Sequence, residues 1–174
     1  MSAPAQAVQE TETLDLDSLR RMSFDELQAL YRSSRKPATL ADLDGDAKGA
    51  MLAWRTPRSG PLAWLLQTFG SSSIFPWLGK SFRSNNVSEG EGINRINLLV
   101  ARPQWFRFAT RFADSFLDGQ PAFVLDYSRF GNPPLIRQIV DEVREVAPRL
   151  YMGPAAIKLG GRPRLVLFFA VSHQ

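Results

Sequence analysis

Lys80 is the side chain in this sequence most able to do chemistry inside a protein. It alternates with Leu78 and Phe82 in a strand-like run, so an inward-facing Lys80 would lie on an otherwise apolar face. A lysine in such surroundings binds its proton less tightly, and it can then act as a base, form a Schiff base or hold a carboxylate. The competing interpretation turns this face outward and leaves Lys80 in solvent.

Other polar side chains stand at similar positions. Arg95 and Asn97 share one face of the next strand-like run, where they would orient the oxygen atoms of a ligand or, if that face is outward, meet solvent. Asp126 and Tyr127 end a later run, and neighbours in a strand point to opposite sides, so only one of them can face inward. A phenol in a pocket can act as a general acid, and it is also a common filler of apolar cores.

Composition excludes several kinds of site. The chain has no cysteine, and its single histidine, His173, is the penultimate residue. A disulfide framework, a thiolate nucleophile and a Ser-His-Asp triad are therefore excluded, and neither a metal site nor a cofactor is expected. Gly90 and Gly92 flank a glutamate, but the third glycine of a nucleotide-binding loop is missing.

Two β-hairpins are the clearest elements that must position these side chains. The predicted strands cover residues 48–54, 77–83, 93–101, 106–112, 122–127, 150–158 and 165–171. Asp118-Gly119 joins the fourth strand to the fifth, and Gly160-Gly161 joins the last two; both pairs tolerate the positive φ that a tight hairpin turn needs. Residues 105–116 also fit a helical period, but the Asp-Gly turn that follows favours a strand.

Helices are predicted between and before the strands. Residues 14–22 form a short helical turn, and Ser23 and Glu26 make a capping box at the start of an amphipathic helix. A second, strongly apolar helix is predicted over 61–69, and a third over 135–146. The charged residues of the third are predicted to form ion pairs on its surface: Arg137, Asp141, Glu142, Arg144 and Glu145.

These elements predict a mainly β (α+β) protein. Its strands close an antiparallel, lipocalin-like barrel, with an N-terminal helix and one or two additional short helices. Residues 1–13 are expected to be a disordered acidic tail and residues 14–174 a single barrel domain. Residues 1–17 hold four acids and no base, so the rest has 21 basic and 13 acidic residues, a net charge of +8.

The order of these features resembles that of calycin-type bacterial proteins, the group that contains the lipocalins. The similarity spans roughly residues 40–172 and rests on Trp77-x-Gly-Lys-x-Phe82, Leu117-Asp-Gly119, Leu125-Asp-Tyr127, Asp141-Glu-x-Arg144 and Leu150-Tyr-Met-Gly153. It implies a small barrel that carries a hydrophobic ligand, and a few proteins of the lipocalin fold are enzymes. The chain lacks the Gly-x-Trp start of true lipocalins, since Trp54 falls five residues after Gly49.

We expect a cytoplasmic binding protein for a small hydrophobic or amphipathic molecule, and the charges of Lys80 and Arg95 favour an acidic head group. Ligand contacts are expected from Lys80, Phe82, Arg95, Asn97, Phe123, Asp126, Tyr127 and Tyr151. The alternative is a cofactor-independent isomerase, cyclase or lyase that acts on an apolar substrate in the same cavity, with Lys80, Asp126 or Tyr127 as acid or base.

Two stretches of the sequence bear on whether the partner is a nucleic acid or a membrane surface. The run 105–112 interleaves aromatics with arginines, but alternation puts the two kinds on opposite faces, so nucleic acid is not expected. Residues 62–77 are rich in apolar side chains, and a peripheral membrane contact there is an alternative to a buried helix. The sequence shows no secretory signal and no membrane-spanning run, and it predicts no oligomeric state.

Overall fold

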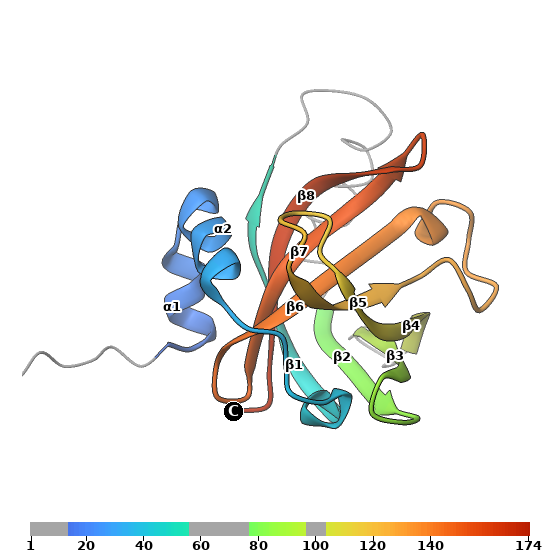
Figure 1. Ribbon diagram of the computed structural model, residues 1–174, viewed down its shortest axis with the longest axis horizontal. Coiled ribbons are helices and arrows are strands. Elements are labelled where there is room, and N and C mark those ends of the chain that lie inside the picture. The colour runs from blue at the N-terminus through green and yellow to red at the C-terminus, as the bar shows by residue number, and fades with distance from the viewer. Residues whose placement is uncertain (1–13, 56–76, 97–103) are drawn as a thin grey trace, which may run out of the picture.

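The computed structural model describes residues 14–55, 77–96 and 104–174. Within these ranges the chain forms a closed antiparallel barrel in which each strand pairs with the next along the chain. The strands are β1 (Gly45–Trp54), β2 (Trp77–Ser84), β3 (Glu89–Ile96), β4 (Gln104–Asp114), β5 (Pro121–Asp126), β6 (Ile139–Ala147), β7 (Leu150–Leu159) and β8 (Arg162–Ser172). Strand β8 returns to pair with β1, which confirms the predicted antiparallel barrel (Figure 1).

Both predicted hairpins are present. Strands β4 and β5 are joined by a turn in which Gly119 has a φ of 71°, and β7 and β8 by a turn in which Gly160 and Gly161 have φ values of 59° and 78°. These are left-handed conformations that glycine adopts without a steric penalty. Most of the segment 105–116, which also fitted a helical period, belongs to strand β4, as the Asp-Gly turn indicated.

Two helices precede the barrel and lie against its outer wall (Figure 1). They are α1 (Leu16–Arg21) and α2 (Phe24–Ser33). The predicted capping box of α2 is formed, since the Ser23 amide donates to the Glu26 carboxylate at 2.7 Å. Their apolar side chains are buried with outward-facing residues of β7 and β8 in one cluster: Leu19, Leu27, Tyr31, Leu150, Met152, Phe168 and Ala170. No helix in the described ranges is long and apolar enough to cross a membrane.

The predicted helix over 135–146 is wrong. That segment forms a single 3₁₀ turn, η2 (Ile136–Gln138), followed by β6. Its apolar residues also fit a strand buried on both sides, with Val143 in the barrel interior and Val140 in an outer cluster. The predicted surface ion pairs are therefore wrong too, because Asp141, Glu142 and Arg144 are all buried. The tail 1–13, the helix over 61–69 and the proposed membrane contact up to residue 76 lie outside the described residues.

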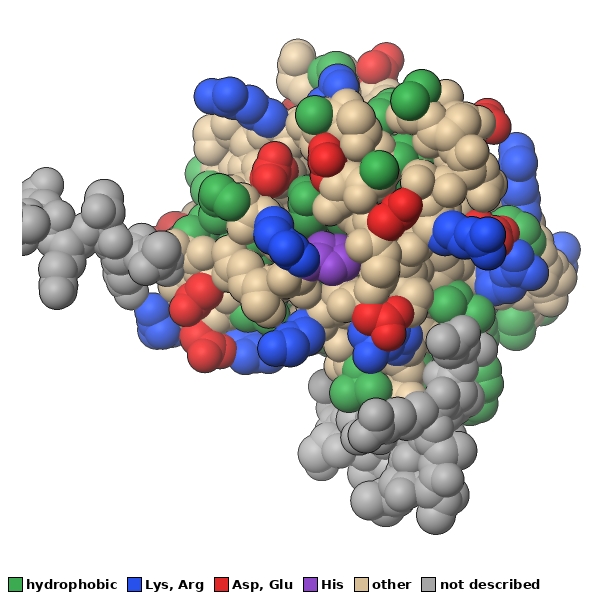
Figure 2. All heavy atoms as spheres, turned by 90° about the horizontal axis from the view of Figure 1, so that it is seen from below, with side chains coloured by type: hydrophobic (Ala, Val, Ile, Leu, Met, Phe, Trp, Pro, Cys, Tyr) green, Lys and Arg blue, Asp and Glu red, His purple; other side chains and the backbone are tan. Residues whose placement is uncertain are grey.

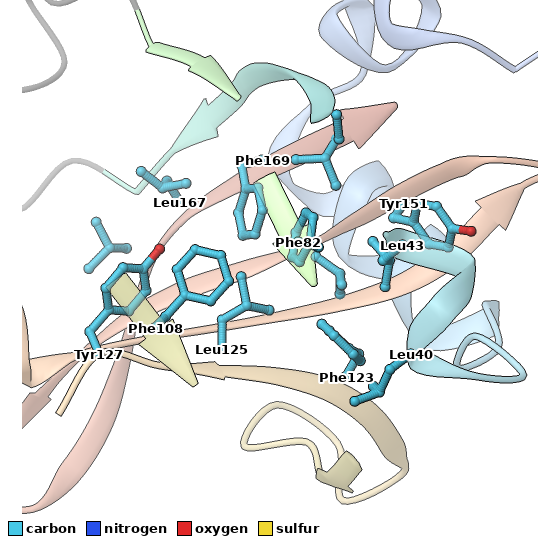
Figure 3. Packing of buried hydrophobic residues seen from close by; sticks show 14 of the residues in the cluster. Leu40, Leu43, Phe82, Phe108, Phe123, Leu125, Tyr127, Tyr151, Leu167 and Phe169 are labelled. Atoms are coloured by element: carbon cyan, nitrogen blue, oxygen red, sulfur yellow. The ribbon is translucent and has the colours of Figure 1, made fainter. Parts of the chain in front are cut away.

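A 3₁₀ turn, η1 (Leu40–Leu43), closes one end of the barrel. Leu40 and Leu43 are buried in the interior cluster, and Figure 3 shows them beside Tyr151 and Phe123. The Tyr151 hydroxyl donates to the Asp42 carbonyl oxygen at 2.9 Å, which fastens the turn to β7. Seen from below, acidic and basic side chains are interspersed around the histidine (Figure 2).

Candidate functional site

The end of the barrel opposite η1 contains a cavity of about 150 Å³. In an up-and-down barrel the last residues of odd-numbered strands and the first residues of even-numbered strands meet at one end. The lining follows this rule: it includes the end of β1, the start of β2, the end of β3 and the start of β4. Most lining side chains are apolar or aromatic, among them Trp54, Trp77, Phe106, Ile139, Leu167 and Phe169.

Four polar side chains interrupt the apolar lining, and hydrogen bonds join them into one cluster. The ammonium group of Lys80 donates to Oδ1 of Asn94 at 2.9 Å, to the hydroxyl of Tyr127 at 2.5 Å and to Oδ2 of Asp141 at 3.0 Å. Each of the four residues is at most 9% exposed. A lysine ammonium has three N–H groups, so these three bonds use all of them.

Tyr127 and Asn94 complete the polar cluster. The Tyr127 hydroxyl lies 3.1 Å from Oδ2 of Asp141, to which it donates, and 3.1 Å from Nδ2 of Asn94, from which it accepts. Oδ1 of Asn94 also accepts from Nε1 of Trp77, and its Nδ2 also donates to the carbonyl oxygen of Phe106, both at 3.2 Å. These contacts fix the amide orientation and leave the cluster little rotational freedom.

Asp141 is the one member of this cluster with an unmet bonding capacity. Its Oδ2 accepts from both Lys80 and Tyr127. Its Oδ1 is buried and has no hydrogen-bond partner among the described residues. Buried carboxylate oxygens almost always accept from a donor, so this atom has capacity for one further hydrogen bond.

Burial controls the electrostatics of the cluster. It lowers the pKa of Lys80, and the nearby Asp141 carboxylate opposes this change. Burial and the charge of Asp141 both raise the pKa of Tyr127 well above 10.0. The Lys80 ammonium also lies 5.1 to 5.4 Å from the ring centres of four aromatic residues: Trp77, Phe108, Tyr127 and Phe169. At such distances the rings attract a desolvated cation, which offsets part of the lost hydration.

Two strand pairings are irregular next to aromatic side chains that line the cavity. The pairing of β2 with β3 shifts between Trp77 and Gly79, so Trp77 lines the cavity together with Lys80. Strict alternation would have put them on opposite faces, because they are three positions apart. The pairing of β3 with β4 shifts opposite Phe106, which has a φ of 61° and also lines the cavity. Such β-bulges change the direction of a side chain without ending the strand.

The sequence-predicted site residues separate into groups. Lys80 and Tyr127 line the cavity. Phe82, Phe123 and Tyr151 lie deeper in the interior cluster, nearer to η1, and do not line the cavity (Figure 3). They serve as core packing.

Two predicted site residues face outward. Arg95 forms an ion pair with Asp46 at 3.6 Å on the outer wall, so its expected position in the interior is wrong. Asp126 alternates with the inward-facing Leu125 and Tyr127, and its carboxylate accepts from the Ser128 amide. Because the side chain of Asp126 points away from the interior, its expected place in the site is wrong too. Asn97 lies outside the described residues.

Sequence reasoning missed two members of the cluster for different reasons. Asn94 lies two positions before the apolar Ile96 and so on the same strand face, and alternation extended backward from Ile96 would have found it. Asp141 gave no local signal, because its partner Lys80 is 61 positions away and its segment was interpreted as a helix.

A second buried polar network lies outside the barrel, beneath α2. Glu142 accepts from the hydroxyls of Ser115 and Tyr31 at 2.6 and 2.9 Å and from the Phe116 amide at 2.7 Å. Arg144 binds Asp118 with two hydrogen bonds, at 2.8 and 2.7 Å. This network attaches α2 and the β4–β5 turn to β6, and nothing in it lines the cavity.

Three or more His, Cys, Asp or Glu side chains in a metal-binding arrangement do not occur in the described part of the chain. The cavity combines an apolar wall with four polar residues. That arrangement can hold a small apolar molecule and accept a hydrogen bond through Asp141.

Comparison with known proteins identifies the fold alone. The chain matches no protein-family model and no curated protein. A solved structure described as a protein from Thermomonospora curvata superposes with a TM-score of 0.58 at 15% sequence identity, and the match covers 91% of this chain and 92% of that one.

Proposed function

We propose that this protein binds a small, largely apolar molecule in the barrel cavity. The observation that carries the proposal is a cavity whose walls are aromatic and aliphatic and whose four polar residues form one nearly satisfied cluster. Ligand sites commonly combine an apolar wall with a few convergent polar groups.

The volume of the cavity sets the size of the part of a ligand that can be buried in it. An apolar cavity of about 150 Å³ inside a protein is known to hold a molecule of the size of benzene. The cavity here has a similar volume. A single six-membered ring, or the cyclic part of a longer molecule, therefore fits best.

The calycin-like identity and the cytoplasmic location belong to the same proposal. Closed barrels of eight antiparallel strands are the architecture of lipocalin-type carriers, and this chain has such a meander with a cavity at one end. The absence of cysteine is compatible with a reducing compartment.

The acidic head group expected from the sequence has little support. Arg95 is on the outer wall, and every N–H of Lys80 is used within the cluster. The charge of Lys80 is moreover balanced by Asp141. A buried carboxylate ligand would lack a cation of its own, which is costly.

Filling the cavity tests the proposal directly. Ala155 lines the cavity, and Ala155→Leu should occupy part of its volume. Methylcyclohexane is the probe, because it does not absorb where tryptophan does and Trp54 and Trp77 line the cavity as reporters. We expect a saturable fluorescence change that Ala155→Leu weakens and that Ala109→Leu, on the outer face of β4, leaves unchanged. Absence of any saturable binding by the unaltered protein would refute the proposed function.

One observation favours an enzyme as the second candidate. Lys80, Tyr127 and Asp141 all line the cavity within hydrogen-bond distance of one another, which is the geometry that acid–base catalysis needs. A cofactor-independent isomerase, cyclase or lyase would use Asp141 and Tyr127, not Asp126. Exchange of the α-hydrogens of cyclohexanone in D₂O distinguishes an enzyme from a binding protein. A binding protein adds nothing to the buffer rate, whereas an enzyme of this kind accelerates exchange and loses that activity on Tyr127→Phe.

A further inference from the structure

Every hydrogen-bond donor of the polar cluster is already committed. The three N–H groups of Lys80 go to Asn94, Tyr127 and Asp141. The single hydroxyl proton of Tyr127 goes to Oδ2 of Asp141, and the amide group of Asn94 donates to Tyr127 and to the Phe106 carbonyl oxygen. One acceptor of the cluster, Oδ1 of Asp141, therefore stays unpaired, and the described residues leave no donor for it.

The cluster has one unpaired hydrogen-bond acceptor, but its charges are balanced. Lys80 and Asp141 form an ion pair at 3.0 Å, and their side chains are only 4% and 6% exposed. An anionic or cationic ligand would add an uncompensated charge to this buried site, which a largely apolar cavity disfavours. A neutral donor supplies what is missing and leaves the charge balance unchanged.

We propose that the molecule bound in the cavity is a neutral alcohol or phenol whose hydroxyl donates to Oδ1 of Asp141. This inference rests on the proposed function, because it assigns the polar group of the same ligand. Lys80 and Tyr127 hold the carboxylate by Oδ2, which leaves Oδ1 to accept from the hydroxyl of the ligand. The apolar walls contact the rest of the molecule.

A set of probes of similar shape tests the inference. Methylcyclohexane, cyclohexanol and cyclohexanone carry a methyl group, a hydroxyl and a carbonyl on the same six-membered ring. Only cyclohexanol can donate a hydrogen bond. Tryptophan fluorescence of the full chain measures each dissociation constant, since Trp54 and Trp77 line the cavity. We expect cyclohexanol to bind roughly 10-fold or more tightly than cyclohexanone, the scale of a hydrogen bond to a charged acceptor.

Asp141→Asn changes the acceptor into a donor and provides the sharpest comparison. The amide oxygen of Asn should turn to the Lys80 ammonium, which leaves its NH₂ group at the position of Oδ1. The preference for cyclohexanol over cyclohexanone should then disappear or reverse. Asp126→Asn, the same substitution on the outer wall, should leave the preference unchanged.

The outcomes separate the two proposals. If none of the three probes binds, the proposed function fails. If all three bind but cyclohexanol and cyclohexanone bind equally to the unaltered protein, or if Asp141→Asn keeps the preference for the alcohol, the hydroxyl assignment fails. Should Asp141→Asn not fold, Lys80→Met/Asp141→Leu removes both charges together. That double variant should bind methylcyclohexane and show no preference for the alcohol, and a retained preference would contradict the inference.

Discussion

The carboxylates of Asp141 and Glu142 lie on opposite sides of the barrel wall, although the two residues are adjacent in β6. Asp141 binds Lys80 inside the barrel, whereas Glu142 accepts from Tyr31 of α2 outside it. Both residues are at most 4% exposed. One strand therefore supports two independent buried polar networks, one at the cavity and one beneath the N-terminal helices, and the two can be tested separately.

Lys80→Met should destabilise the protein strongly. It leaves the buried Asp141 carboxylate without its cation, and loss of one partner of a buried pair costs about 3–5 kcal/mol. Lys80→Met/Asp141→Leu should recover most of that loss, because replacing both charges by apolar groups is often close to neutral. Urea unfolding gives the free energies. A single variant as stable as the unaltered protein would mean that the ion pair does not form.

Glu142→Gln should change how stability depends on pH. Burial, the largest cause, raises the pKa of Glu142 above 4.5 in the folded protein. The folded state therefore holds the Glu142 proton more tightly than the unfolded state does. The resulting stabilisation is complete below pH 4.5 and is lost as pH rises through the folded pKa.

The measurement is the free energy of unfolding of the unaltered protein minus that of Glu142→Gln, from acid to neutral pH. This difference should fall as pH rises across that window. Glu89→Gln, an exposed site in the β2–β3 hairpin, controls for the loss of a carboxylate. A difference that rises with pH would contradict the assignment.

Arg144→Lys should be costly even though it preserves the charge. The guanidinium binds both oxygens of Asp118 and donates to the backbone carbonyl oxygens of Tyr31, Gln120 and Pro121. Lysine has three donors on one atom and cannot reproduce this fork. We expect a loss of about 2–4 kcal/mol in urea unfolding, against about 0.5 kcal/mol or less for the exposed Arg137→Lys. Equal losses at the two positions would show that the hydrogen bonds of the Arg144 guanidinium do not contribute to stability.

Gly79→Ala should damage the barrel next to the cavity. Gly79 has a φ of 132°, and a Cβ there would lie 2.0 Å from the carbonyl oxygen of Ala47 in β1. Both the backbone strain and the clash oppose the change, and we expect a loss of about 2–4 kcal/mol. Gly160→Ala is the control, since its φ is 59° but no atom of the described residues lies within 4 Å of the added Cβ. It should cost about 1–2 kcal/mol, the penalty of the left-handed conformation alone. Similar losses in thermal or urea unfolding would rule out the steric contribution.

Local signals were enough to predict much of the barrel. The Asp-Gly and Gly-Gly turns were visible because a positive φ restricts residue type at single positions. Alternation with period two placed Lys80 on one face with Leu78 and Phe82, but it left open whether that face is inward. The structure turns both Lys80 and Tyr127 toward the cavity. The capping box of α2 depended only on Ser23 and Glu26, which lie within one helical turn.

The tertiary structure alone decided where the buried charges find partners. Asp141 and Arg144 had the spacing of surface ion pairs on a helix, and only the neighbouring strands β5 and β7 make the segment a strand. The bulge in β2 turned Trp77 inward against simple alternation. The ion pair of Lys80 with Asp141 forms because barrel closure brings together residues 61 positions apart. The sequence by itself determined turns and faces, since these depend on adjacent residues, whereas the composition of the site depends on contacts that only the closed barrel creates.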